Sequence, residues 1–96
     1  MSNIRFVWDH RKAAANMQKH GVSFEEAKSV FYDDNARLMS DPDHSDIEER
    51  FVLLGISAQL RILMICHCYR TRDSVIRIIS ARKATPRERK SYQEAL

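Results

Sequence analysis

The pattern of hydrophobic and polar residues changes partway along the chain, from helical spacing to strand spacing. At the start, Ile4, Phe6 and Trp8 alternate with their neighbours, which predicts a short first strand. Residues 10–20 are rich in alanine and contain neither glycine nor proline, so we expect a helix there. A second apolar stripe at helical spacing ends near residues 33–35 and predicts a second helix.

Residues that favour helix ends bound these segments. Asp9 and Gly21 flank the first helix as the expected N-cap and C-cap residues. Ser23 and Glu26 have the spacing of a capping box, in which the hydroxyl accepts from the Glu26 amide and the carboxylate accepts from the Ser23 amide. The same pattern recurs at residues 85–88 with proline at the first helical position, which predicts a last helix that begins there and reaches the C-terminus.

The apolar segments between these helices predict four further strands. Residues 37–39 are a weak candidate, whereas residues 49–57, 61–69 and 74–81 are rich in isoleucine, valine and leucine. Their connections are short, which favours antiparallel neighbours because a parallel crossover needs a dozen residues or more. The predicted order is βααββββα.

This order predicts one α+β domain over residues 1–96. Two N-terminal helices are expected to pack on an antiparallel β-sheet of four to five strands, with a C-terminal helix after it. The central strands are apolar on both faces, so the C-terminal helix or a partner protein is expected to cover the second face.

Composition narrows the class of protein. The chain has 96 residues, of which 44% are hydrophobic and 30% charged, as in globular proteins. The longest apolar run, residues 62–66, is far too short to cross a bilayer, and the first residues lack the apolar core of a signal peptide. We therefore expect a cytoplasmic protein with no membrane partner. Cys66 and Cys68 are expected to be reduced structural thiols on one side of a strand.

Positive charge is concentrated in the second half of the chain. Residues 1–48 carry 6 basic and 9 acidic side chains, whereas residues 49–96 carry 10 and 4, which predicts a polyanionic partner. Arg82 and Lys83 lie where the last strand meets the last helix, a corner that suits a phosphate, although solvated edge charges are the alternative interpretation. By strand period Arg77 faces away from Arg82 unless a bulge intervenes.

Neither a metal site nor a cofactor site is predicted. Along a strand, His67 points away from both Cys66 and Cys68, and no second pair of such ligands lies at zinc-finger spacing. Residues 41–46 resemble the opening of a calcium loop, but the sixth position is aspartate rather than glycine and the twelfth is Val52. The chain has only two glycines and no phosphate-cradling motif, so we expect no nucleotide cofactor.

Several blocks of residues together resemble the BrnT family of toxins. The blocks are W-D at 8–9, K-H-G-V-S-F at 19–24, E-E-R at 48–50 and I-R-I-I-S-A-R-K-A at 76–84. The resemblance covers nearly the whole chain and implies a fold similar to RelE-type ribonucleases. It also implies the toxin role in a type II toxin–antitoxin module. The implied partner is a BrnA-type antitoxin, which neutralises the toxin and supplies the DNA-binding domain for operator DNA.

The resemblance further implies metal-independent endonucleolytic cleavage of RNA, which inhibits translation and growth. In that reaction the ribose 2′-hydroxyl attacks the adjacent phosphorus, so the protein must stabilise a dianionic phosphorane and move protons. We assign Arg82 and Arg61 to the phosphate. Lys19 and His20, at the end of the first helix, are assigned to proton transfer, with His67 as the fallback. Further contacts to RNA phosphates are expected from Lys83, Arg77, Arg50 and Arg72.

Two other functions stay open. A non-catalytic nucleic-acid-binding module would hold phosphates with the same basic surface, with an affinity that falls steeply with salt and without turnover. A pure interaction protein would only bind its antitoxin through an exposed apolar sheet face. The nuclease hypothesis requires the basic head groups to converge on one anion pocket near the end of the last strand.

Overall fold

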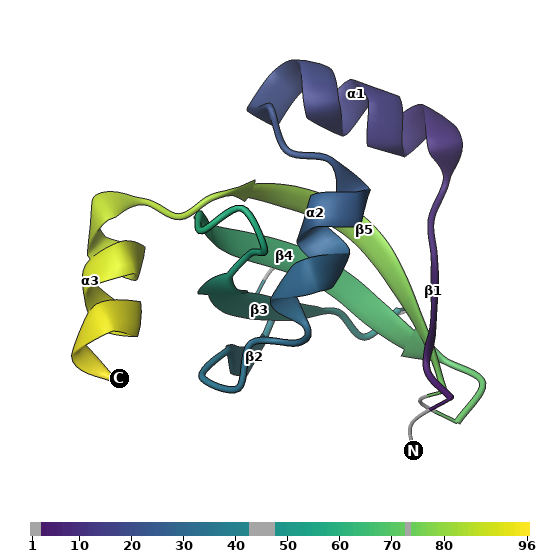
Figure 1. Ribbon diagram of the computed structural model, residues 1–96. Helices are drawn as coiled ribbons and strands as arrows, with labels where there is room; N and C mark the ends of the chain where they lie inside the picture. Colours follow the sequence, from purple (N-terminus) through teal and green to yellow (C-terminus); the bar gives the residue numbers. More distant parts are fainter. Residues whose placement is uncertain (1–2, 43–47, 73) are drawn as a thin grey trace.

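A five-stranded sheet forms the centre of the molecule, with two helices on one face and a third helix at one end (Figure 1). The computed structural model describes residues 3–42, 48–72 and 74–96. The predicted α+β class and the order βααββββα are confirmed. The elements are β1 (Arg5–Val7), α1 (His10–His20), α2 (Phe24–Val30), β2 (Arg37–Ser40), β3 (Phe51–Ile56), β4 (Ile62–Arg70), β5 (Val75–Lys83) and α3 (Pro86–Glu94).

The sheet is mixed rather than wholly antiparallel. Its strand order is β1-β5-β4-β3-β2, and the strands from β2 to β5 form the predicted antiparallel meander. β1 instead pairs parallel with β5. Short connections favour antiparallel pairing only between strands that follow one another in the chain. The chain between β1 and β5 is long enough for a parallel pairing.

The helix ends follow the sequence with one exception. The Asp9 carboxylate accepts from two amides of the first turn of α1, and Gly21 ends that helix with a φ of 67°. The capping box at Thr85 has both of its hydrogen bonds. At α2, the Ser23 hydroxyl accepts from the Glu26 amide as predicted, at 3.0 Å. The return bond from the Glu26 side chain was predicted wrongly, because that carboxylate is used in the interior.

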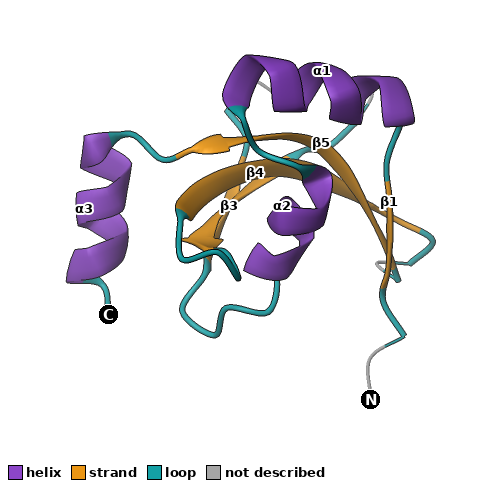
Figure 2. Ribbon diagram, turned by 45° about the horizontal axis from the view of Figure 1, so that its top comes forward, coloured by secondary structure: helices purple, strands orange, loops and turns teal. Residues whose placement is uncertain are grey.

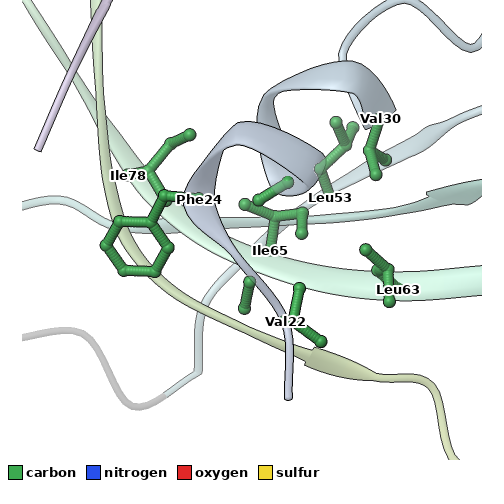
Figure 3. Packing of buried hydrophobic residues seen from close by; sticks show 9 residues of the cluster. Val22, Phe24, Val30, Leu53, Leu63, Ile65 and Ile78 are labelled. Carbon is green, nitrogen blue, oxygen red and sulfur yellow. The ribbon is translucent and has the colours of Figure 1, made fainter. Parts of the chain in front are cut away.

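The hydrophobic core lies between the sheet and the helices α1 and α2. Its buried side chains interdigitate in one layer (Figure 3), namely Val22, Phe24, Ala27, Val30, Leu53, Leu63, Ile65, Ile78 and Ala81. Each large aliphatic side chain buried in this way stabilises the fold by about 1.5–3 kcal/mol. α2 approaches β3 so closely that a Cβ on Gly55 would lie 2.8 Å from a methyl group of Val30. The buried Asn16 side chain joins α1 to β5 by bonding both the N–H and the C=O of Ala81.

A bulge in β5 changes which side chains share a face of the sheet. Cys66 of β4 lies opposite Ser80, but its neighbour lies opposite Ile78, so Ile79 is an extra residue in β5. As a result Arg77 and Arg82 point to the same face of the sheet, the face opposite α1 and α2. Strict alternation predicted opposite faces, and the extra residue makes that prediction wrong. We call this face the open face.

α3 covers one end of the open face. Tyr92 of α3 and Ala84 pack with Leu54, and further apolar side chains of β3 and β4 surround them. The C-terminal helix thus covers part of the second apolar face, as expected. In Figure 2 it lies apart from α1 and α2 at the end of the sheet. Of the predicted polar connection at residues 41–46, positions 43–46 lie outside the described residues, and none of the described helices is long and apolar enough to span a membrane.

Candidate functional site

Three arginines meet around one carboxylate on the open face. Arg70 and Arg77 donate to Oε1 of Glu48 at 3.0 and 3.2 Å, and Nε of Arg50 donates to Oε2 at 3.1 Å. The arginines come from β4, β5 and the segment just before β3, at positions that face the same way. We call these four residues the arginine cluster. Cys68 also lies beside it, with Sγ 3.6 Å from Oε1 of Glu48.

The arginine cluster has an excess of positive charge and is accessible. The hydrogen bond from Arg50 holds the pKa of Glu48 below its ordinary value, so this carboxylate is ionised at neutral pH. Guanidinium groups stay protonated, so within these four residues three cations meet one anion, and the pKa of Arg50 is raised by its hydrogen bond to Glu48 and also by the Asp41 carboxylate. The side chain of Arg70 is 51% exposed and that of Arg77 is 26% exposed. Each guanidinium has five N–H donors, so donors are left over for a further oxyanion.

A hollow of about 800 Å³ adjoins the arginine cluster. It is lined by Leu38, Glu48, Glu49, Phe51, Cys68, Tyr69 and Arg70. The hollow therefore combines charged groups with aromatic surface at the end of the sheet.

Arg82 lies farther along the open face and already has an internal anion. It lies opposite Met64, whereas Arg77 lies opposite Cys68, so the two backbone positions are about 13 Å apart along β4. Its guanidinium donates to both oxygens of Glu88 at 2.8 and 3.0 Å. That pairing lowers the pKa of Glu88 to about 2. The corner predicted to suit a phosphate is thus occupied by a carboxylate of α3.

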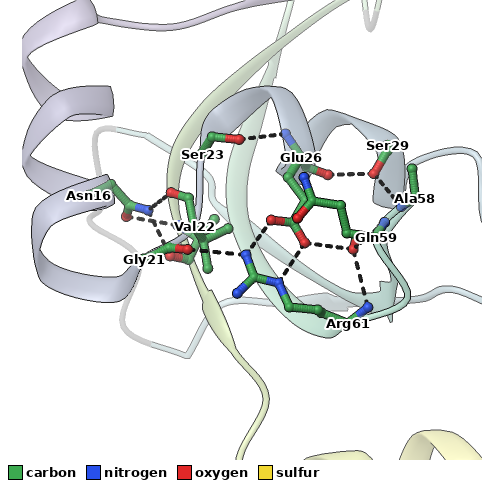
Figure 4. Close-up of polar contacts among 11 residues, drawn as sticks. Asn16, Gly21, Val22, Ser23, Glu26, Ser29, Ala58, Gln59 and Arg61 are labelled. Atoms are coloured by element: carbon green, nitrogen blue, oxygen red, sulfur yellow. Dashed lines mark hydrogen bonds and ion pairs between the residues drawn. The ribbon is translucent and has the colours of Figure 1, made fainter.

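Arg61 lies on the opposite side of the sheet, against α2. It forms a bidentate ion pair with Glu26 and donates to the carbonyl of Gly21 at 3.1 Å (Figure 4). Ser57 Oγ donates to the same carboxylate at 2.7 Å. Glu26 is only 5% exposed, and the hydrogen bond from Arg61 lowers its pKa. Arg61 therefore ties the α1–α2 connection to the turn before β4.

The other predicted site residues lie near either the arginine cluster or the Arg61–Glu26 ion pair. Lys19 and His20 form the last turn of α1, next to the carbonyl that Arg61 binds, and Lys83 lies opposite Leu63 on the same helix side. Arg72 lies in the turn between β4 and β5. The basic residues therefore do not converge on one pocket, because the sheet separates Lys19, His20, Arg61 and Lys83 from the open face.

His67 lies in the core beneath α2. It is 0% exposed, and Phe31 packs edge-on against its ring at 4.8 Å. Nδ1 donates to the carbonyl of Ile65, and Nε2 accepts from the Tyr69 hydroxyl. Burial lowers the pKa of His67, so the ring is neutral at pH 7. Its use as a fallback for proton transfer is not supported, because no substrate can reach it in this structure.

The two cysteines lie on the face opposite His67, as expected from the strand period. Burial raises the pKa of the Cys66 thiol to about 11, which keeps it protonated. Among the described residues, no three histidine, cysteine, aspartate or glutamate side chains come together as a metal site would require.

Glu48 and Arg70 belong to the arginine cluster but were not assigned by sequence reasoning. The available signal was alternation: positions 48 and 50, just before β3, are two residues apart, and so are positions 66, 68 and 70 within β4. Alternation shows which side chains of one strand share a face, but it does not show which strands are neighbours. The bulge in β5 also interrupts the alternation between Arg77 and Arg82.

Comparison with known proteins decides the family. Residues 8–88 match the family of the ribonuclease toxin BrnT of type II toxin–antitoxin systems. The chain belongs to this family. The crystal structure of the Brucella abortus ribonuclease toxin BrnT has the same fold, with a TM-score of 0.64 and 23% identity over 85% of this chain and 97% of that chain. No curated protein matches.

Membership confirms the resemblance seen in the sequence. The BrnT family is a family of ribonuclease toxins, and a toxin of a type II module has an antitoxin as its partner. The arginine cluster and the Arg61–Glu26 ion pair with its basic neighbours are therefore the two candidate functional sites of this chain.

Proposed function

We propose that this BrnT toxin cleaves RNA without a metal ion and thereby inhibits translation and growth. A ribose 2′-hydroxyl attacks the adjacent phosphorus, the bond from phosphorus to the 5′-oxygen of the next nucleotide breaks, and that oxygen leaves as a hydroxyl. A BrnA-type antitoxin neutralises it, and operator DNA is bound only through the toxin–antitoxin complex. The protein acts in the cytoplasm. The observation that supports this proposal best is the arginine cluster on the open face, where three guanidinium groups already hold one anion.

The arginine cluster suits a phosphodiester because of its charge and its geometry. A guanidinium binds two oxygens of one anion in parallel, and the arginines reach the cluster from three different segments. Arg82 continues the same face about 13 Å away, so a single RNA strand lying along the open face meets Arg77 first and Arg82 later.

In the reaction these residues supply electrostatic stabilisation. Attack on phosphorus adds negative charge to the non-bridging oxygens, and donors fixed in advance at that position lower the barrier. We propose Arg77 and Arg50 as the groups that hold the reacting phosphate, with Arg82 and Arg72 on flanking phosphates. Arg70 takes part together with Arg77 and Arg50, because it donates to the same carboxylate of Glu48.

The helix-side residues form a second set of candidates. Lys19 and His20 are the proposed groups for proton transfer if the reacting phosphate lies on this side of the sheet, where Arg61 and Lys83 lie beside them. Arg61 is already paired with Glu26, so this set has less charge to offer a phosphate than the arginine cluster. The same cleavage assay ranks the two sets.

The test is RNA cleavage by the purified chain in the presence of a metal chelator. We expect fragments that end in a 2′,3′-cyclic phosphate, and an Arg77→Ala variant about 100- to 1000-fold slower. Arg11→Ala is the matched control, since Arg11 is an exposed arginine of α1 and its loss should leave the rate unchanged. Intact RNA with salt-sensitive binding would instead indicate a non-catalytic binding module. Harmless overexpression without antitoxin would indicate a pure interaction protein.

A further inference from the structure

The β2 edge of the sheet is exposed along its whole length. β2 is the outermost strand on its side and pairs only with β3 among the described strands. All four of its residues are exposed, including Leu38 at 52% and Met39 at 36%. An exposed strand with apolar side chains is a template for pairing with another chain.

The hydrogen-bond pattern shows which backbone groups of β2 face outward. The amide of Asp41 donates to the carbonyl of Arg50 at 3.0 Å, so these two residues form a hydrogen-bonded pair. Bonded and non-bonded pairs alternate in an antiparallel ladder, and Met39 therefore also bonds to β3. The N–H and C=O groups of Leu38 and Ser40 then point away from the sheet, where an incoming strand would meet them.

The two sides of this edge differ in chemistry. On the open-face side a hollow of about 700 Å³ lies between β2 and α3, and Arg37 donates to Ser91 Oγ of α3 at 2.9 Å. Arg37, Arg87 and Lys90 line it, with Glu94 as its one carboxylate among the described residues. On the helix side, Leu38 lines the hollow that also contains Phe51 and Tyr69. The edge is therefore basic on one side, whereas on the other side Leu38, Phe51 and Tyr69 give it an apolar and aromatic surface that borders the arginine cluster.

We propose that the antitoxin docks on this edge by adding an extended segment to β2. Its side chains alternate between acidic residues, which face Arg37, Arg87 and Lys90, and apolar residues, which face Leu38 and Phe51. Main-chain hydrogen bonds supply affinity in such strand addition, and the alternating side chains supply specificity. The occupant follows from family membership, because a type II toxin has an antitoxin partner, and from the basic charge of the open-face side. The proposal does not depend on the RNA chemistry.

Docking at β2 also accounts for neutralisation. The end of β2 is joined to Arg50 by the Asp41 hydrogen bond, and Arg50 belongs to the arginine cluster. A segment that continues past Ser40 would run toward the end of the sheet at which that cluster lies. The antitoxin then blocks the open face without binding in the reacting position itself.

Amide hydrogen exchange measured by NMR tests whether the antitoxin binds at the β2 edge. The isotope-labelled chain is measured alone and in complex with the antitoxin of its own module. We expect exchange at Leu38 and Ser40 to slow at least about tenfold in the complex. The outward-facing amide of Phe6, in the opposite edge strand β1, is the internal control and should not change. Unchanged exchange at both β2 amides would overturn the proposal.

Two variants at one position separate strand pairing from side-chain contact. Ser40→Pro removes an outward N–H without removing a bond to β3, and it should weaken antitoxin binding about tenfold or more. Ser40→Ala keeps the N–H and should bind as the wild type does. Equal affinity for all three chains would contradict strand addition. Protection of Leu38 in the free chain that rises with its concentration would show that a second copy, rather than the antitoxin, occupies the edge.

Discussion

On the helix side of the sheet one arginine meets one carboxylate, whereas on the open face three arginines meet one. Arg61 and Glu26 cancel each other, and Glu26 is buried with a third partner in Ser57. Within the arginine cluster itself three arginines share the one carboxylate of Glu48, and Arg70 is half exposed. The same residue types therefore hold the fold together in one region and offer a site for an anion in the other.

The comparison shows why a list of basic residues does not locate a site. Arg61 and Arg77 look equivalent in the sequence, since each lies in or next to a strand of the basic half. What separates them is the number of carboxylates that each meets in the fold and the burial of those carboxylates.

The largest expected difference between the two regions is in the free energy of unfolding that is lost when an arginine is removed. Arg61→Ala leaves the buried carboxylate of Glu26 without its cation, so we expect the free energy of unfolding to fall by about 3 kcal/mol. Arg77→Ala removes one of three partly exposed cations that share a single carboxylate, and it should cost less than about 1 kcal/mol. Urea unfolding of both variants measures the difference. Equal losses would show that the two regions do not differ as described.

Local signals were enough to predict most of the fold. Asp9, Gly21 and Thr85 act within a few residues of themselves, so their caps could be read directly from the sequence. The Ser23–Glu26 spacing fits both a capping box and the buried ion pair observed here. The choice between them depends on Arg61, which lies 35 residues away in the chain.

The candidate site could be predicted only in part, because it depends on register between strands. Arg50 and Arg77 were both expected to contact RNA phosphates, but their meeting point at Glu48 requires neighbouring strands to be aligned. The extra residue Ile79 moves Arg77 to the face of Arg82, and nothing in the period of β5 marks that bulge.

The pH dependence of stability tests the ion pair between Arg61 and Glu26 through a substitution of Glu26. The pKa of Glu26 is lowered by Arg61, so this carboxylate stabilises the fold above its ordinary pKa of 4.5, and the contribution is lost as pH falls through the lower value in the folded state. Glu26→Gln should be less stable than the wild type at pH 7. The gap between them should close as pH is lowered below 4.5, as measured by urea unfolding at several pH values. A constant gap would exclude an ionised Glu26 as its cause.

Arg82 shares one property with each region. It lies on the open face, as the arginine cluster does, but it is paired with one carboxylate, that of Glu88, as Arg61 is with Glu26. We expect Arg82→Ala to slow RNA cleavage by about tenfold, less than Arg77→Ala, since much of the charge of Arg82 is already neutralised. Glu88→Gln frees that charge and should tighten RNA binding. A loss for Arg82→Ala as large as that for Arg77→Ala would place the reacting phosphate at the α3 end of the face.

The smallest expected effect is on the salt dependence of RNA binding, and it separates the two regions without any measurement of cleavage. Each phosphate contact to single-stranded nucleic acid adds about 0.7 to the slope of log affinity against log salt. Arg77→Ala should therefore make the slope shallower by about 0.7.

The double variant Glu26→Gln/Arg61→Gln removes the helix-side pair without changing the net charge, and it should leave the slope unaltered if it stays folded. Fluorescence anisotropy with a 2′-O-methyl RNA, which lacks the attacking hydroxyl, measures binding alone. A shallower slope for the double variant would mean that RNA reaches the helix side as well, because only released counterions change this slope.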